Sequence, residues 1–147
     1  MSRPAGTVTE AEYRSLLEFR DQLRQFQHWS EQQAIDAGIT PAQYQLLLAV
    51  RGHPGGAPTV GEVADHLLLR HHSVVGLIDR AEAAGLVERR PDRDDHRLVR
   101  LRLTATGARV LRRLAGLHLE ELRRRPPTLD AVVLNGRGGH NETEGES

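Results

Sequence analysis

A switch in hydrophobic spacing constrains this chain of 147 residues more than any other feature. Over residues 63–67 and again over 74–81, apolar residues recur every three or four positions, which is the spacing of an α-helix with one buried side. After Gly85 the spacing becomes two, because apolar residues alternate with arginines over 99–103. Such alternation is typical of a half-buried strand. The predicted order is therefore helix, tight turn, helix and two-stranded hairpin.

Capping boxes predict where several helices begin. In each box a threonine accepts a hydrogen bond from the backbone three residues later, and the Glu or Gln there reaches back to the threonine. The pairs are Thr9 with Glu12, Thr40 with Gln43 and Thr59 with Glu62. The predicted helices cover about residues 9–37, 40–51, 59–67, 71–84 and 104–125, with strands at 86–90 and 99–103 and a charged loop over 91–97.

This order of elements is that of a winged helix-turn-helix, so the expected fold class is mainly α with one small β-hairpin. A helix has about the width of the DNA major groove, and the tip of a hairpin can carry arginine into the minor groove. The candidate DNA-binding residues are Thr59, Arg70, His71, His72, Ser73, Val75, Gly76, Arg80, Arg93, His96 and Arg97. Thr59 is included because a helix N-terminus offers amide hydrogens to a phosphate.

Two of these candidates have close acidic neighbours. Asp95 is expected to orient Arg97 toward the minor groove, although a solvated loop of mixed charge is the alternative. Arg80 either contacts DNA or is held in an ion pair, since Asp79 stands beside it.

The formal net charge of the chain is zero, but the charged residues are unevenly distributed along it. Residues 128–147 carry a net charge of −3, and the 14 residues from Arg89 to Arg102 carry +3. All 20 basic residues are arginine, which suits bidentate phosphate and base contacts but also follows from genomic base composition. The body of the chain is therefore mildly basic, and the expected partner is double-stranded DNA.

Several classes of protein are excluded by composition. The chain has no cysteine, so disulfides, thiol catalysis and cysteine-bound metals are excluded. Its histidines lack the spacing that presents two imidazoles on one helical side, and no nucleophile–base pair or phosphate loop is present, so we expect no enzyme activity, no metal and no cofactor. No apolar stretch approaches the roughly 20 residues of a membrane span. A cytoplasmic protein is expected.

Residues 59–107 resemble the MarR family of transcriptional regulators. The motifs are Glu62-Val63-Ala64, Leu77-Ile78-Asp79-Arg80, Gly85-Leu86-Val87-Glu88-Arg89 and Leu103-Thr104-Ala105-Thr106-Gly107, and ITPAQYQLLLAV is similar to the family's second helix. This chain departs from the family in four places. The wing reads Asp95-His96-Arg97 in place of Asp-Arg-Arg, and Gly76 stands where many members have a polar or basic residue. Arg70 occupies the N-cap position of the recognition helix, where Ser or Asp is preferred, and the last helix is short.

The resemblance implies a repressor that responds to a ligand. Small aromatic or anionic effectors of the family bind between the dimerisation helices and the winged unit, which places a pocket at Trp29, Tyr44, Leu48 and His66, with plain core packing as the alternative. A winged helix that contacts another protein and has no operator is the second function considered.

The expected organisation has five parts. These are a flexible N-terminus (1–8), dimerisation helices (9–38 and 104–134), the winged helix-turn-helix (39–103) and a disordered acidic tail (135–147). Both long helices have an apolar stripe that a small domain leaves uncovered, so a homodimer on a palindromic operator is expected.

Overall fold

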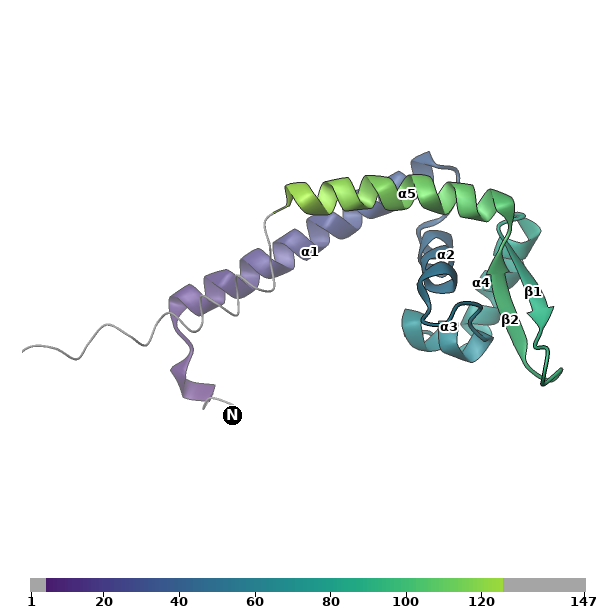
Figure 1. Ribbon diagram of the computed structural model, residues 1–147. Coiled ribbons are helices and arrows are strands. Elements are labelled where there is room, and N and C mark those ends of the chain that lie inside the picture. Colours follow the sequence, from purple (N-terminus) through teal and green to yellow (C-terminus); the bar gives the residue numbers. More distant parts are fainter. Residues whose placement is uncertain (1–4, 126–147) are drawn as a thin grey trace, which may run out of the picture. The chain divides into compact units, whose positions relative to one another are not determined.

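The computed structural model describes residues 5–125, and the order of its elements is the one expected from the sequence (Figure 1). The helices are η1 (Ala5–Thr7), α1 (Glu10–Asp36), α2 (Pro41–Gly52), α3 (Val60–Leu67), α4 (His71–Ala83) and α5 (Ala105–Arg124), and the strands are β1 (Val87–Pro91) and β2 (Val99–Leu103). The chain divides into two compact units. One is Ser30–Glu120, and the other contains the described residues before Ser30 and after Glu120.

Aliphatic side chains form the core of the Ser30–Glu120 unit. Its largest fully buried members come from α2, α3, α4, the hairpin and α5, and include Leu46, Leu47, Val63, Val74, Ile78, Leu101 and Leu114. Each such side chain stabilises the fold by about 1.5–3 kcal/mol when it leaves water. Because this core fixes the buried side of α4, it also fixes which residues of α4 face outward.

The predicted helix boundaries are confirmed by their capping bonds. The Thr40 hydroxyl accepts from the Gln43 backbone at 3.1 Å, and the Thr59 hydroxyl accepts from the Glu62 backbone at 3.2 Å. The reciprocal side-chain bonds are also present. After α1 the backbone turns through Gly38, whose φ of 84° is the left-handed conformation that glycine adopts without strain.

The hairpin is antiparallel, with Val87 opposite Leu103 and Pro91 opposite Val99. The prediction that the first strand covers 86–90 is wrong by one residue. The reason is that the Leu86 N–H bonds to the carbonyl of Ala81 at 2.9 Å and so closes the end of α4. It is therefore not free to begin the ladder.

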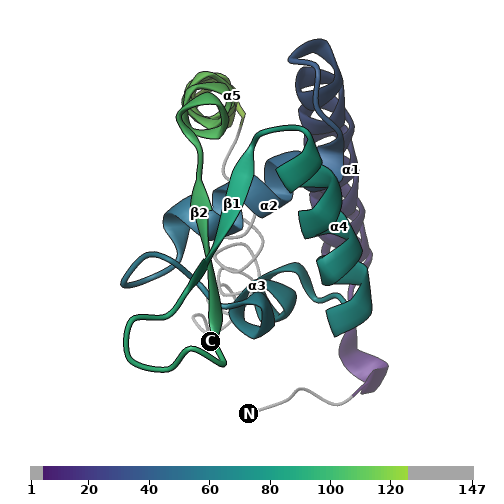
Figure 2. The same ribbon diagram turned by 90° about the vertical axis from the view of Figure 1, so that its right-hand side faces the viewer.

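The strand β2 also contacts the segment that leads into α3. The Leu101 N–H donates to the Pro58 carbonyl at 2.9 Å, and Thr59 and Arg100 form an isolated bridge. Figure 2 shows the loop between β1 and β2 at the same end of this unit as the turn between α3 and α4. The geometry of the fold thus presents these two segments together.

The second unit contains most of α1 and the end of α5. The predicted capping box at the start of α1 is present, with 2.8 Å between the Thr9 N–H and the Glu12 carboxylate. Several large apolar side chains of this part of α1 are exposed, namely Tyr13, Leu16, Leu17 and Leu23. Of the predicted organisation, residues 1–4 and 126–147, which include the acidic tail, lie outside the described residues.

Candidate nucleic-acid interface

The helix α4 has one buried side and one exposed side. Its buried side consists of Val74, Leu77, Ile78 and Ala81, as the spacing predicted. Six candidate residues lie elsewhere on the helix: His71, His72, Ser73 and Arg80 are exposed, and Val75 and Gly76 are half-buried. The polar candidates of α4 are therefore accessible to a partner.

The start of α4 combines an exposed cation with an uncapped helix end. Arg70 occupies the N-cap position in an extended conformation, and its side chain makes no capping hydrogen bond. Serine, threonine or aspartate at this position would stabilise the helix. The preceding turn passes through Leu68 in the left-handed region, with a φ of 54°.

Thr59 lies at the start of α3, and its polar groups are used within the chain. Its hydroxyl caps the helix, and its backbone N–H donates to the Glu62 carboxylate at 3.0 Å. A phosphate contact by Thr59 stays a prediction.

The acidic residues beside Arg80 are bound to a different arginine. Arg89 on β1 lies 2.6 Å from the Asp79 carboxylate and 2.9 Å from that of Glu82. Arg80 itself is exposed, and no carboxylate among residues 5–125 pairs with it. The ion pair that Asp79 offered in the sequence is thus made with Arg89, which leaves Arg80 accessible.

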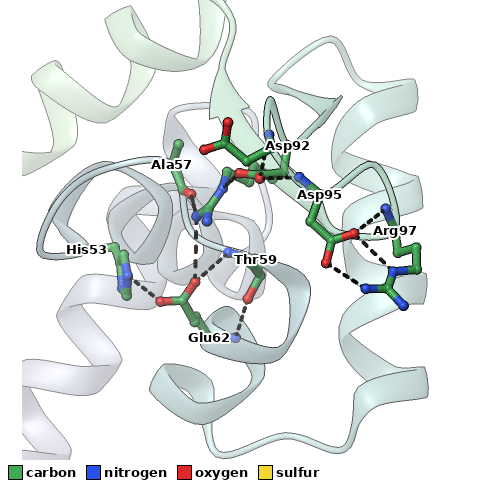
Figure 3. Close-up of polar contacts among 9 residues, drawn as sticks. His53, Ala57, Thr59, Glu62, Asp92, Asp95 and Arg97 are labelled. Atoms are coloured by element: carbon green, nitrogen blue, oxygen red, sulfur yellow. Dashed lines mark hydrogen bonds and ion pairs between the residues drawn. The ribbon is translucent and has the colours of Figure 1, made fainter.

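The wing, residues 92–98 between the strands, is held by carboxylates (Figure 3). Asp92 accepts hydrogen bonds from the backbones of Asp94 and Asp95 at 3.1 and 2.9 Å. Asp95 accepts from both the backbone and the guanidinium of Arg97 at 3.1 Å, as expected. The Arg97 side chain is nevertheless 91% exposed. The wing therefore presents an oriented arginine to solvent, with Arg93 and His96 also exposed.

Arg100 anchors the wing and was not among the predicted site residues. Its guanidinium bonds to the Asp92 carboxylate and, at 2.9 Å, to the Ala57 carbonyl, and it lies 3.9 Å from Glu62. The hydrogen bond from Arg100, followed by those from the Asp95 and Asp94 backbones, lowers the pKa of Asp92 to about 2. This carboxylate is consequently charged at neutral pH and ties the wing to the loop before α3.

Glu62 connects the same network to two histidines. Its carboxylate lies 2.7 Å from His53 Nε2, and His53 Nδ1 lies 2.9 Å from His66 Nε2. The backbone N–H of Thr59 is the main cause of a lowered pKa at Glu62. His66, predicted to line an effector pocket, contacts His53.

Comparison with known proteins agrees with this geometry. The pattern of the MarR family matches residues 37–98, which contain α2, α3, α4, β1 and the wing. Over this segment the chain is similar to the MarR family. The repressor NicR of Pseudomonas putida is 33% identical over 81 residues, which cover 55% of this chain and 50% of NicR. The chain thus spans about half the length of this relative.

Solved MarR structures share the fold. AbsC, a MarR family regulator from Streptomyces coelicolor, superposes with a TM-score of 0.69 at 23% identity and 94% coverage of both chains. BpsR of Bordetella bronchiseptica, whose DNA binding is regulated by 6-hydroxynicotinic acid, gives a TM-score of 0.60 at 24% identity, covering 81% of this chain and 92% of BpsR.

One glycine of the MarR-like motifs has a steric explanation here. A Cβ added at Gly107 would lie 2.0 Å from the carbonyl oxygen of Leu86. The first turn of α5 therefore approaches the base of the hairpin too closely for a side chain.

Three of the four residues of the predicted effector pocket, Trp29, Tyr44 and His66, contact another ring. Trp29 stacks on Phe26 with 6.0 Å between ring centroids, and Tyr44 stacks on His118 at 4.4 Å. His118 was not predicted as a site residue; it is buried and lies 2.6 Å from the Ser30 hydroxyl. Burial raises the pKa of Tyr44. Leu48 is 47% exposed. The effector pocket stays a prediction.

Within residues 5–125, no group of three or more histidine, aspartate or glutamate side chains is arranged to hold a metal ion. None of the helices described is long and apolar enough to cross a membrane.

Proposed function

We propose that this chain is a sequence-specific, DNA-binding transcriptional repressor that acts as a homodimer. The observation that carries the proposal is the exposure of cationic and polar side chains at the start of α4 and on the wing, at one end of the same compact unit (Figure 2). The exposed residues are Arg70, His71, His72, Ser73, Arg93, His96 and Arg97. In this proposal the chain binds DNA in the cytoplasm and does not catalyse a reaction.

In this proposal α4 enters the major groove and the wing enters the adjacent minor groove. Ser73 and His72 reach base edges or phosphates near the start of α4. Arg97, oriented by Asp95 and 91% exposed, inserts into the minor groove, where negative potential favours a guanidinium. Phosphate contacts supply most of the affinity, and base contacts supply the sequence preference.

The homodimer is supported by apolar side chains that water would otherwise contact. On α1 they are Tyr13, Leu16, Leu17 and Leu23, and on α5 they are Leu119 and Leu122. Covering them with a second copy gains about 25 cal/mol per Å² of apolar surface. A twofold pair places two α4 helices on half-sites about 34 Å apart, so the operator is a palindrome.

Regulation by a small aromatic or anionic effector is supported by the relative BpsR, whose DNA binding responds to 6-hydroxynicotinic acid. Trp29, Tyr44, Leu48 and His66 remain the proposed contacts. An effector that prefers the form of the dimer with mismatched half-site spacing by about 1.4 kcal/mol weakens DNA binding tenfold.

A mobility-shift experiment with the upstream region of the chain's own gene tests the proposal. We expect a discrete complex that Arg97→Ala weakens by about 1–3 kcal/mol if Arg97 reads groove edges, or less and uniformly if it touches only phosphate. Arg109→Ala is the matched control, because Arg109 is also exposed but lies on α5. Absence of binding to any duplex at low salt would refute the proposal and favour a protein-binding winged helix.

A further inference from the structure

Gly76 lies in the interior of α4, and nothing in the described part of the chain requires a glycine there. An added Cβ would meet only Arg80 Nη1, at 3.4 Å, which is ordinary contact. The contrast is Gly107, where the Leu86 carbonyl leaves no room for a side chain. Glycine weakens the interior of a helix. Because no contact within the described residues explains Gly76, we look for its explanation in a bound partner.

Arg80 lies one turn beyond Gly76 on the same side of the helix. Residues four apart on a helix are neighbours on its surface, so His72, Gly76 and Arg80 form a line along α4. The Arg80 guanidinium extends back over Gly76, as the 3.4 Å distance shows. We call the gap at Gly76, between His72 and Arg80, the Gly76 notch.

Arg89 binds both carboxylates of α4. Its guanidinium bonds to the carboxylates of both Asp79 and Glu82, at 2.6 and 2.9 Å, and its backbone N–H also donates to Glu82 at 3.3 Å. α4 has no other carboxylate, and Asp79 and Glu82 stand one and two positions from Arg80 in the sequence. Neither lies three or four positions away, where side chains of a helix meet. The Arg89 side chain is 28% exposed, so the arrangement, the Arg89 clamp, is partly shielded from solvent.

Resting on the proposed function, we propose that Arg80 reads a guanine across the Gly76 notch, and that Arg89 acts as a positioning residue for Arg80. Guanine presents two acceptors, O6 and N7, in the major groove, and the planar guanidinium offers two parallel N–H donors to them. With no side chain at Gly76, the edge of the base pair approaches the helix backbone. The clamp neutralises the two carboxylates of α4, which would otherwise repel DNA near Arg80.

The test is selection of duplexes from a random pool, with base preference measured at every position. For the wild type we expect one strongly preferred guanine in each half-site. Arg80→Ala should reduce the preference at that position by about 5- to 150-fold and leave the other positions unchanged. Arg80→Lys keeps the charge but lacks the planar fork, so it should restore overall affinity without restoring the guanine preference.

Gly76→Ala tests the notch, with Gly116→Ala as its control. Gly116 is an exposed glycine inside the helix α5, with no atom within 4 Å of an added Cβ. Both changes should strengthen their helices, but only Gly76→Ala should weaken the preference at the base read by Arg80. Equal base preferences in the two variants would overturn the role of the notch.

Arg89→Ala tests the clamp, together with a second variant in which the two carboxylates are also removed. Arg89→Ala should weaken the guanine preference, and adding Asp79→Asn and Glu82→Gln should restore it, because the negative charges that Arg89 neutralised are then absent. If Arg89 only stabilised the fold, removing its two carboxylate partners as well would not restore the guanine preference. Failure of the rescue would therefore overturn the positioning role.

The outcomes separate the two proposals. If the wild type enriches no duplex, the proposed function itself fails. If it enriches a duplex but Arg80→Ala weakens binding equally for all sequences, with a shallower salt dependence, then Arg80 contacts phosphate. That result would overturn guanine reading and leave DNA binding intact.

Discussion

Replacing Gly107 by alanine should destabilise the chain strongly, although the change adds a single methyl group. The new Cβ would lie 2.0 Å from the Leu86 carbonyl oxygen and 2.9 Å from its carbon, so the backbones must separate by about 1 Å to reach the 3.0 Å limit of real contacts. The same junction holds two hydrogen bonds, from the Thr104 N–H to Leu86 at 3.1 Å and from the Thr104 hydroxyl to Gly85 at 2.6 Å.

The magnitude follows from these terms. Overpacking costs about 1–3 kcal/mol, and each hydrogen bond lost costs about 1 kcal/mol. The better helix propensity of alanine returns up to about 1 kcal/mol. We therefore expect the free energy of unfolding to fall by about 2–4 kcal/mol, a large part of the roughly 5–15 kcal/mol of a typical domain.

Urea unfolding followed by circular dichroism measures this loss. The midpoint should fall by about 1–2 M for Gly107→Ala, and it should rise slightly for Gly116→Ala, which meets no atom within 4 Å. Protein concentration is kept equal, because association raises apparent stability. A Gly107→Ala midpoint within experimental error of wild type would refute the steric reasoning.

Three further predictions concern α4, the core and the wing. Arg70→Ser supplies the side-chain cap that α4 lacks, so it should raise thermal stability by about 1 kcal/mol while weakening DNA binding; unchanged melting would contradict it. Leu101→Ala, at a fully buried position, should cost about 2–5 kcal/mol in urea unfolding, whereas Leu98→Ala, at a 41% exposed position, should cost far less; equal losses would contradict this. Because the pKa of Asp92 is lowered from 3.8 to about 2, mainly by Arg100, its stabilising contribution is present above pH about 4 and disappears as the pH falls to about 2. Asp92→Asn should flatten the stability curve over that range, and a slope identical to wild type would count against it.

The sequence predicts most of this fold because its strongest signals are local. A capping box spans four residues, so Thr40 and Thr59 mark the starts of α2 and α3 without knowledge of the rest of the chain. The spacing of apolar residues along α4 likewise predicts which side of the helix is buried. The one-residue error at β1 arose where two elements compete for the same N–H, that of Leu86, and spacing does not say which of them obtains it.

The parts of the site that sequence reasoning missed depend on partners far apart in the chain. Alternation places Arg100 on one side of β2, but its bonds to Asp92 and Ala57 join residues 8 and 43 positions apart. The same holds for Arg89, whose carboxylates on α4 lie 7 and 10 positions earlier. Such pairings follow from how the hairpin packs on the helices, which no window of neighbouring residues contains.

Backbone hydrogen bonds within the wing fix the number of residues that it can contain. The Asp92 N–H donates to the Leu98 carbonyl at 2.9 Å, and the Leu98 N–H donates to Asp95 at 3.0 Å, so the loop is closed by its own backbone. Surface loops usually tolerate insertions, but one extra residue here would break this closure and turn Arg97 away from its present direction. The conformational entropy of the wing is already lost on folding. Binding of DNA by the wing would therefore not show the calorimetric signature of a segment that becomes ordered on binding.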